Sequence, residues 1–233
     1  MKNILRLSLI LFLSVLFLPT LSFAQGEKKA AYGILLDNTG TMFTQIETVK
    51  TLGKALAQDA SKRGIVSVFN FKTQGDINDK KSFLAVATSG TEWSQDKNTI
   101  EKYINTIEVA RGQTTLWDAI RSMAKAIDER AKAENLSEKI IFLITDGEDR
   151  ASEVTDKQLL KELKEIGVKV YAIGLTQELA SGINFGSSEG RSKKYLKKFA
   201  QETNGNVIFP KLKKDTKIED LLTQLFAEQP RKK

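Results

Sequence analysis

The stretch AYGILLDNTGT, residues 31–41, places an apolar run directly before a cluster of polar, oxygen-bearing residues. The first six residues have the length and composition of a buried β-strand. A helical spacing of apolar or small residues follows at Ile46, Val49, Gly53 and Leu56. A buried strand that leads into a helix is typical of a parallel α/β sheet, so residues 37–41 are expected in the loop at the carboxyl end of the first strand.

The alternation of strands and helices continues along the chain. Further strands are expected at residues 65–71, 82–88, 139–145, 168–175 and 207–209. A long helix is indicated by Trp117, Ile120, Ala124, Ile127 and Ala131, and a closing helix by residues 218–225. Strands buried on both faces and separated by helices predict an α/β fold: a doubly wound, mostly parallel six-stranded sheet flanked by helices. The run Ser82–Thr88 is expected to be one antiparallel edge strand.

Three polar segments follow strands or open helices of this predicted sheet. They are residues 37–41 (DNTGT), residues 112–119 (GQTTLWDA) and residues 144–149 (ITDGED). In a parallel sheet all three lie at the carboxyl edge, where open α/β sheets bind their ligands. Two carboxylates and three hydroxyls would then converge, and such hard oxygen ligands suit Mg²⁺ or Mn²⁺.

These segments resemble the metal-ion-dependent adhesion site of the von Willebrand factor type A family. That site reads D-x-[ST]-x-[ST], then a Thr in a G-x-T segment, then an Asp in a T-D-G segment. The matching residues here are Asp37, Thr39, Thr41, Thr114 and Asp146. The resemblance extends over nearly all of the chain after residue 24, including the order of strands and helices and the closing stretch 199–210.

The resemblance implies a non-catalytic protein-binding module that uses Mg²⁺ or Mn²⁺. In the family, the hydroxyls that correspond to Thr39 and Thr41 bind the cation directly, and Asp37 binds through water or orients the ligands. Thr114 and Asp146 exchange between direct and water-mediated contact, and a Glu or Asp carboxylate of a partner protein completes the shell. Thr41 departs from the commoner Ser, and its extra methyl group would crowd the site.

Two other interpretations use the same residues. In the first, Thr39 and Thr41 cap the first helix and Asp146 and Asp149 cap the next, without any metal. In the second, DNTGT resembles the phosphorylated-aspartate motif of haloacid-dehalogenase-type phosphohydrolases, with Asp37 as the nucleophile. That match is thinner, because Thr39 stands where the general acid would be and Asp149 falls one residue early. The absence of histidine excludes Ser-His and Cys-His dyads and His-bound zinc.

Residues near the motifs carry weaker signals. Asp118 is expected to act as a capping or supporting residue, and Glu148 and Asp149 as solvated turn residues. Trp117 and Met42 are expected in the core, and Phe43 is a candidate for the border of the site.

Residues 1–24 have the pattern of a secretory signal peptide. A basic start at Lys2 and Arg6 precedes the apolar run Leu7–Leu18, and small residues lie just before Gln25, the expected first mature residue. The apolar run is short of the roughly 20 residues of a membrane-spanning helix. We therefore expect a periplasmic or secreted protein. Its parts are a short segment at 25–30, a von Willebrand factor type A domain at 31–227 and a basic tail at 228–233.

Composition limits the possible partners. The chain has 36 Lys and Arg against 29 Asp and Glu, a net charge of +7, and no cysteine. Lysine pairs gather toward the C-terminus, but nothing beyond net charge points to nucleic acid, so nucleic-acid binding is not expected. No apolar run after the signal peptide is long enough to span a membrane, and a monomer is expected. Partner specificity is expected from the loops at 72–81, 106–116 and 176–192.

Overall fold

The computed structural model describes residues 30–74, 85–110, 114–176, 186–213 and 215–227. The expected signal peptide, the basic tail and part of each expected specificity loop lie outside these residues. The described part contains a six-stranded sheet in the order β3-β2-β1-β4-β5-β6. Its strands are β1 (Ala30–Asp37), β2 (Gly64–Gln74), β3 (Ala85–Gly90), β4 (Glu138–Thr145), β5 (Lys169–Gly174) and β6 (Val207–Ile208).

The pairing of the strands confirms the predicted fold class. β1 pairs in parallel with β2 and with β4, β4 with β5, and β5 with β6, whereas β3 pairs with β2 in the antiparallel direction. The antiparallel strand lies at the edge and covers residues 85–90, against the predicted 82–88; residues 82–84 lie outside the described part. The central strands β1 and β4 are almost completely buried, as their apolar sequences require.

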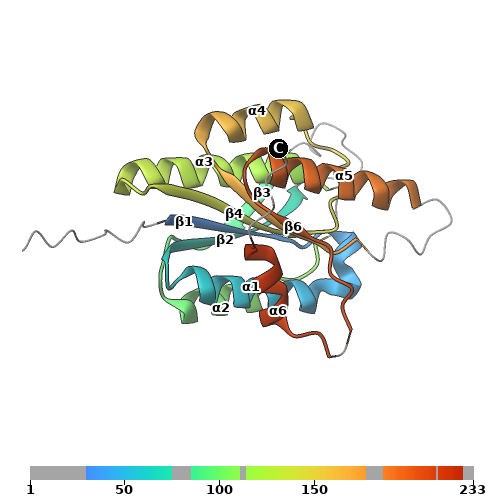
Figure 1. Ribbon diagram of the computed structural model, residues 1–233, viewed down its shortest axis with the longest axis horizontal. Coiled ribbons are helices and arrows are strands. Elements are labelled where there is room, and N and C mark those ends of the chain that lie inside the picture. Colours follow the sequence, from blue (N-terminus) through green and yellow to red (C-terminus); the bar gives the residue numbers. More distant parts are fainter. Residues whose placement is uncertain (1–29, 75–84, 111–113, 177–185, 214, 228–233) are drawn as a thin grey trace, which may run out of the picture.

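Helices cover both faces of the sheet (Figure 1). The described helices are the 3-10 turn η1 (Gly40–Gln45), α1 (Ile46–Ala60), α2 (Lys97–Asn105), α3 (Leu116–Glu134), α4 (Asp156–Ile166), α5 (Gly186–Glu202) and α6 (Ile218–Phe226). One apolar core joins the sheet to α1, α2 and α6, and the other joins it to α3, α4 and α5. The chain is therefore a doubly wound three-layer domain.

Two helices begin at other places than predicted. The polar run of residues 93–107 predicts a helix from Trp93. α2 begins instead at Lys97, because Ser94 pairs with Val66 in an isolated β-bridge and Asp96 caps the helix. Residues 186–192 are predicted as loop but belong to α5. This part of α5 is rich in glycine and serine, which have low helix propensity, so the sequence pattern hides the true start.

Close packing of α3 on β1 depends on one glycine. A Cβ atom on Gly33 would lie 2.2 Å from the Met123 sulfur, so a side chain at this position of β1 would push α3 away. Gly33 therefore lets α3 approach β1 closely.

Candidate metal centre

The two acidic residues of the predicted site lie on neighbouring strands. Asp37 ends β1, and Asp146 directly follows β4, which pairs with β1 up to the register Leu36–Ile144. The chain leaves β1 toward α1 on one face of the sheet and leaves β4 toward α4 on the other. The carboxyl ends of β1 and β4 thus form the topological switch point, the usual place for a ligand in an open α/β sheet.

The first motif folds its hydroxyls toward its own carboxylate. Asp37 is fully buried, and its Oδ1 accepts hydrogen bonds from the main-chain N–H of Thr39 at 3.0 Å and from the Thr39 hydroxyl at 2.7 Å. Its Oδ2 accepts a hydrogen bond from the hydroxyl of Thr145 at 2.6 Å. The Oγ1 atoms of Thr39 and Thr41 are 3.3 Å apart. Asp37 is therefore held from three sides, with two hydroxyl oxygens beside it.

The third motif presents a carboxylate with one oxygen unused. Asp146 is 1% exposed, and its Oδ1 accepts a hydrogen bond from the N–H of Glu148 at 2.9 Å. Gly147 has a φ of +81°, a conformation that favours glycine, and a Cβ there would lie 3.0 Å from the Ser192 Cβ. The turn is thus packed tightly against α5. A hydrogen bond from the Thr41 side chain also reaches the Asp146 carboxylate, so the first and third motifs meet.

The second motif is joined to the other two through the main chain. The carbonyl of Thr114 accepts hydrogen bonds from the N–H groups of Arg150 at 2.9 Å and Ala151 at 3.1 Å. The N–H of Ala110 donates to the carbonyl of Asn38 at 2.7 Å. Thr114 is 3% exposed, and these bonds tie it to the segment that directly follows the third motif. The structure therefore brings all three motifs to one place, although the first and third are joined by side chains and the second by its backbone.

Both buried carboxylates of this edge have raised pKa values, although the charge of Arg150 partly offsets this for Asp146. Burial, and then the negative charge of Asp146, raise the pKa of Asp37 to about 7. Burial also raises the pKa of Asp146, against the hydrogen bonds that lower it. Four buried side-chain polar atoms lack a partner among the described residues, and three belong to the motif segments: Asn38 Oδ1, Thr115 Oγ1 and Asp146 Oδ2. A divalent cation would satisfy the free oxygen and relieve the repulsion, so the residues fit such an ion.

The donor set is rich in neutral oxygens. Within the described part of the chain, no three acidic, histidine or cysteine side chains gather as metal ligands. The edge instead offers the carboxylates of Asp37 and Asp146 together with threonine hydroxyls. Such a set suits Mg²⁺ or Mn²⁺, which prefer oxygen ligands, and it excludes a structural zinc site at this edge.

The helix-cap interpretation is wrong for Thr39, Asp146 and Asp149. Thr39 occupies the N-cap of η1 but makes no side-chain cap hydrogen bond. α4 is capped by Thr155 in a capping box with Gln158, not by Asp146 or Asp149. The Asp149 carboxylate accepts a hydrogen bond from the N–H of Trp117 at 3.2 Å, so it caps α3 instead.

The expectation of a solvated side chain is wrong for Glu148, whereas Asp149 is partly exposed. Glu148 is 7% exposed and forms an ion pair with Arg150 (Nε–Oε2 2.9 Å). Asp118, predicted as a capping or supporting residue, supports the loop before α4, because its carboxylate accepts hydrogen bonds from the N–H groups of Glu153 and Val154. The sequence gives no local signal for the burial of Glu148, because that burial depends on α3 and α5, which pack around the turn.

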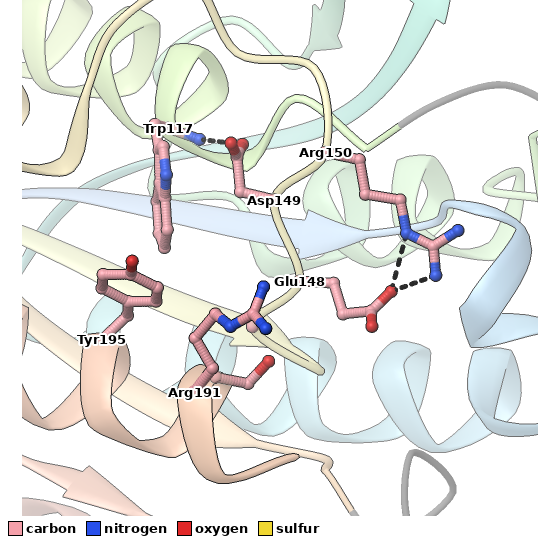
Figure 2. Close-up of a pocket in the computed structure, with 8 residues that line it drawn as sticks. Trp117, Glu148, Asp149, Arg150, Arg191 and Tyr195 are labelled. Carbon is pink, nitrogen blue, oxygen red and sulfur yellow. Dashed lines mark hydrogen bonds and ion pairs between the residues drawn. The ribbon is translucent and has the colours of Figure 1, made fainter. Parts of the chain in front are cut away.

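The surroundings of the site include one exposed aromatic side chain and one cavity. Phe43 is 71% exposed at the border of the first motif, whereas Met42 is buried, as predicted. Trp117 is largely buried, as predicted, but it also borders a cavity of about 310 Å³ beside the third motif (Figure 2). The other residues that line this cavity are Gly147, Glu148, Asp149, Arg150, Arg191, Ser192 and Tyr195.

Comparison with known families and structures agrees with this arrangement. The von Willebrand factor type A domain matches residues 33–224. A comparison with curated protein sequences finds no significant match.

Three solved structures share the fold. The manganese-loaded TRAP protein of Plasmodium vivax has 15% identity and a TM-score of 0.53, covering 84% of this chain and 72% of that one. The open conformation of the pilus adhesin SpaC from Lactobacillus rhamnosus GG has 13% identity and a TM-score of 0.58, covering 85% and 29%. Proximal thread matrix protein 1 from the mussel byssus has 20% identity and a TM-score of 0.53, covering 84% and 46%. The chain thus spans less than half of the last two proteins, and the likeness concerns the fold alone.

Proposed function

The chain belongs to the von Willebrand factor type A domain family, and we propose that it is a divalent-cation-dependent protein-binding module that grips an acidic side chain of its partner. The observation that carries this proposal is the pair of buried carboxylates, Asp37 and Asp146. No lysine or arginine in the described part of the chain lies within ion-pair distance of either. Buried charges are normally paired or coordinate a metal.

Each motif residue has a distinct role in this proposal. Thr39 and Thr41 offer hydroxyl oxygens to the cation, and Asp37, held by Thr39 and Thr145, orients them. Asp146 has a free oxygen, and Thr114 is tied to the segment that directly follows the third motif, in line with the exchange of these two residues that the family resemblance implies. A bound Mg²⁺ or Mn²⁺ supplies an electrophilic position for an anionic oxygen. Neutral hydroxyls leave more of its charge for a Glu or Asp of the partner.

The family match sets aside the enzyme alternative, in which Asp37 attacks a phosphoryl group. The contacts of Asp37 agree with a supporting role, because both of its oxygens already accept hydrogen bonds. A non-catalytic binding module therefore remains the function that the site supports best. The manganese in the TRAP structure is a property of that protein, and it makes Mn²⁺ a natural ion to test here beside Mg²⁺.

Export, a periplasmic or secreted location and a monomeric state are part of the same proposal. None of the helices in the described ranges is both long and apolar enough to cross a bilayer. Sequencing the N-terminus of the protein recovered after expression in an export-competent host tests the leader, and Gln25 is the expected first residue. Sedimentation equilibrium of the same material tests the monomer.

The metal centre is tested by calorimetric titration of the chelator-treated protein with Mg²⁺ and Mn²⁺. We expect binding of one ion per chain to wild type and no binding to Asp37→Asn or Asp146→Asn. Asp215→Ala is the matched control, because it removes an equal charge from an exposed position and should bind as wild type does. A folded wild-type protein that takes up no metal at millimolar concentration would falsify the proposal.

A further inference from the structure

The cavity beside the third motif is a second polar site, and its position is fixed by the candidate metal centre that it adjoins. Gly147 and Glu148, which line it, directly follow Asp146 in the chain. On the opposite wall, α5 contributes Arg191, Ser192 and Tyr195, and its Ser192 packs against the Gly147 turn. Its volume of about 310 Å³ is near the small end of the roughly 300–1,000 Å³ of pockets that hold small ligands. It can therefore take one side chain of a partner bound at the metal centre.

The carboxylates that line the cavity are already engaged. Glu148 is paired with Arg150, and Asp149 accepts hydrogen bonds from the N–H of Trp117 and from the hydroxyl of Ser152. These contacts hold both acidic side chains within the domain, so neither presents an unpaired carboxylate to an incoming cation. The cavity is therefore unsuited to a lysine or arginine of the partner.

Arg191 lines this cavity and has no ion-pair partner within the part of the chain that the structure describes. Its side chain is exposed. Figure 2 shows its guanidinium directed from α5 toward the segment that carries Glu148 and Asp149. Lys194 is exposed on the same helix but does not line the cavity. The cavity thus offers one guanidinium for one anion.

We propose that this cavity binds a second carboxylate of the same partner through Arg191, so that the partner is an acidic segment with two carboxylates. The inference rests on the proposed function, because the first carboxylate binds at the metal centre. A planar guanidinium pairs with a carboxylate through two parallel hydrogen bonds, which gives geometric specificity as well as energy. Tyr195 and the edge of Trp117 form an aromatic wall for the methylene groups of a Glu or Asp side chain.

The test begins with a random peptide library displayed on phage. Wild type is loaded with Mg²⁺, and peptides released by chelator are collected. We expect the enriched peptides to carry two acidic residues at a constant spacing. Arg191→Ala should enrich peptides that keep only one acidic residue, while Lys194→Ala, the matched control on α5, should enrich the same peptides as wild type.

The best enriched peptide is then synthesised with each Glu or Asp replaced in turn by its amide, and its binding is measured by calorimetry. Arg191→Ala should weaken the parent peptide on the order of tenfold and should not weaken further the peptide whose second carboxylate is already removed. Arg191→Lys, which keeps the charge and loses the fork, should recover part of the affinity.

The outcomes separate this inference from the function on which it rests. Metal-dependent peptides with a single acidic residue, or equal affinity of wild type and Arg191→Ala for the parent peptide, would overturn the second carboxylate site and leave the metal centre standing. Enrichment of no metal-dependent peptide by wild type would overturn the proposed function, and the second site with it.

Discussion

Two buried acidic regions lie at opposite ends of β4, and they differ in whether cations of the chain pair with them. At the end where the strand begins, Asp128 of α3 is 8% exposed and receives the ammonium groups of Lys132 at 2.6 Å and Lys139 at 2.9 Å. The hydrogen bond from Lys132 is the largest cause that holds the pKa of Asp128 below its usual value. At the other end, Asp37 and Asp146 have pKa values raised by burial, and no cation of the described residues pairs with them.

The difference supports the proposal that Asp37 and Asp146 serve binding, whereas Asp128 serves stability. The chain carries 36 lysines and arginines, so positive charge is not scarce, and two lysines serve Asp128. Leaving two adjacent carboxylates buried without a cation costs stability in the absence of ligand. Buried charged groups that lower stability in this way are typical of binding sites. The comparison therefore implies that the cation for Asp37 and Asp146 comes from solution, and the following predictions test that implication.

The largest expected effect is stabilisation of the domain by Mg²⁺. A ligand that binds only the folded state at about 1,000 times its dissociation constant stabilises that state by about 4 kcal/mol. We expect chemical denaturation to show this gain in the free energy of unfolding for wild type and no such gain for Asp146→Asn. Asp128→Asn should retain the gain, because its cations are internal. An equal gain in wild type and Asp146→Asn would place the metal elsewhere and break the comparison.

In the metal-free protein, Asp37 and Asp128 should make the stability of the domain change with pH in opposite directions. The pKa of Asp37 is about 7 in the folded protein, above its value of 3.8 in the unfolded chain, so the folded state holds the extra proton between these values. Stability therefore falls as pH rises through this window, by about 1.4 kcal/mol per pH unit, or about 2–3 kcal/mol from pH 5 to pH 7. Asp128, with a lowered pKa, contributes stability above its unfolded pKa that is lost as pH falls through its folded pKa.

This pH effect is measured by denaturant unfolding in chelator, as the difference between wild type and Asp37→Asn. The chain has no histidine, which removes the side chain that usually titrates in this range. Asp37→Asn should become the more stable of the two proteins as pH rises. If the difference in stability between the two proteins stayed constant from pH 5 to pH 8, the charge of the Asp37 carboxylate would have to be balanced by other groups of the fold.

A smaller effect is expected at Asp128. Asp128→Asn should destabilise the domain by about 1–2 kcal/mol at neutral pH, mainly through Lys139, which is 21% exposed. Lys132 makes the largest contribution to the pKa of Asp128, but it is 74% exposed, so solvent screening should leave it little effect on stability. Glu134→Gln is the matched control on α3, since its ion pair with Arg130 is more exposed and should be worth no more than about 0.5 kcal/mol. Equal losses in the two variants would remove the distinction between the buried pair and a surface pair.

The parts of the fold that the sequence predicts are those determined by local pattern. The apolar runs of β1 and β4 suit strands buried on both faces, and the parallel sheet then brings Asp37 and Asp146 to the same edge. The predicted ligand residues need no more than this topology to be placed together. That prediction required a strand order, not an atomic contact.

The parts that the sequence does not predict depend on contacts between distant segments. Thr145 reads as the last residue of a strand, yet its hydroxyl donates to Asp37 and accepts the N–H of Gly147. The cavity around Arg191 requires α5 to begin at Gly186, within a stretch whose residues have low helix propensity. Side-chain partners more than 100 residues apart, as for Thr145 and Asp37, leave no periodic trace in the sequence.

The smallest predicted effect concerns Thr41, where the family more often has Ser. Its hydroxyl contacts Thr39 and hydrogen-bonds to Asp146, so the oxygen is in place, but the methyl group occupies space near the expected cation. Thr41→Ser should bind Mg²⁺ on the order of threefold more tightly, about 0.6 kcal/mol. Thr41→Val keeps the shape and removes the oxygen, and it should lose binding by tenfold or more, about 1.4 kcal/mol. Calorimetric titration of both variants separates crowding from ligation. Weaker binding by Thr41→Ser would mean that the stiff χ1 of threonine aids the site by holding its hydroxyl toward Asp146.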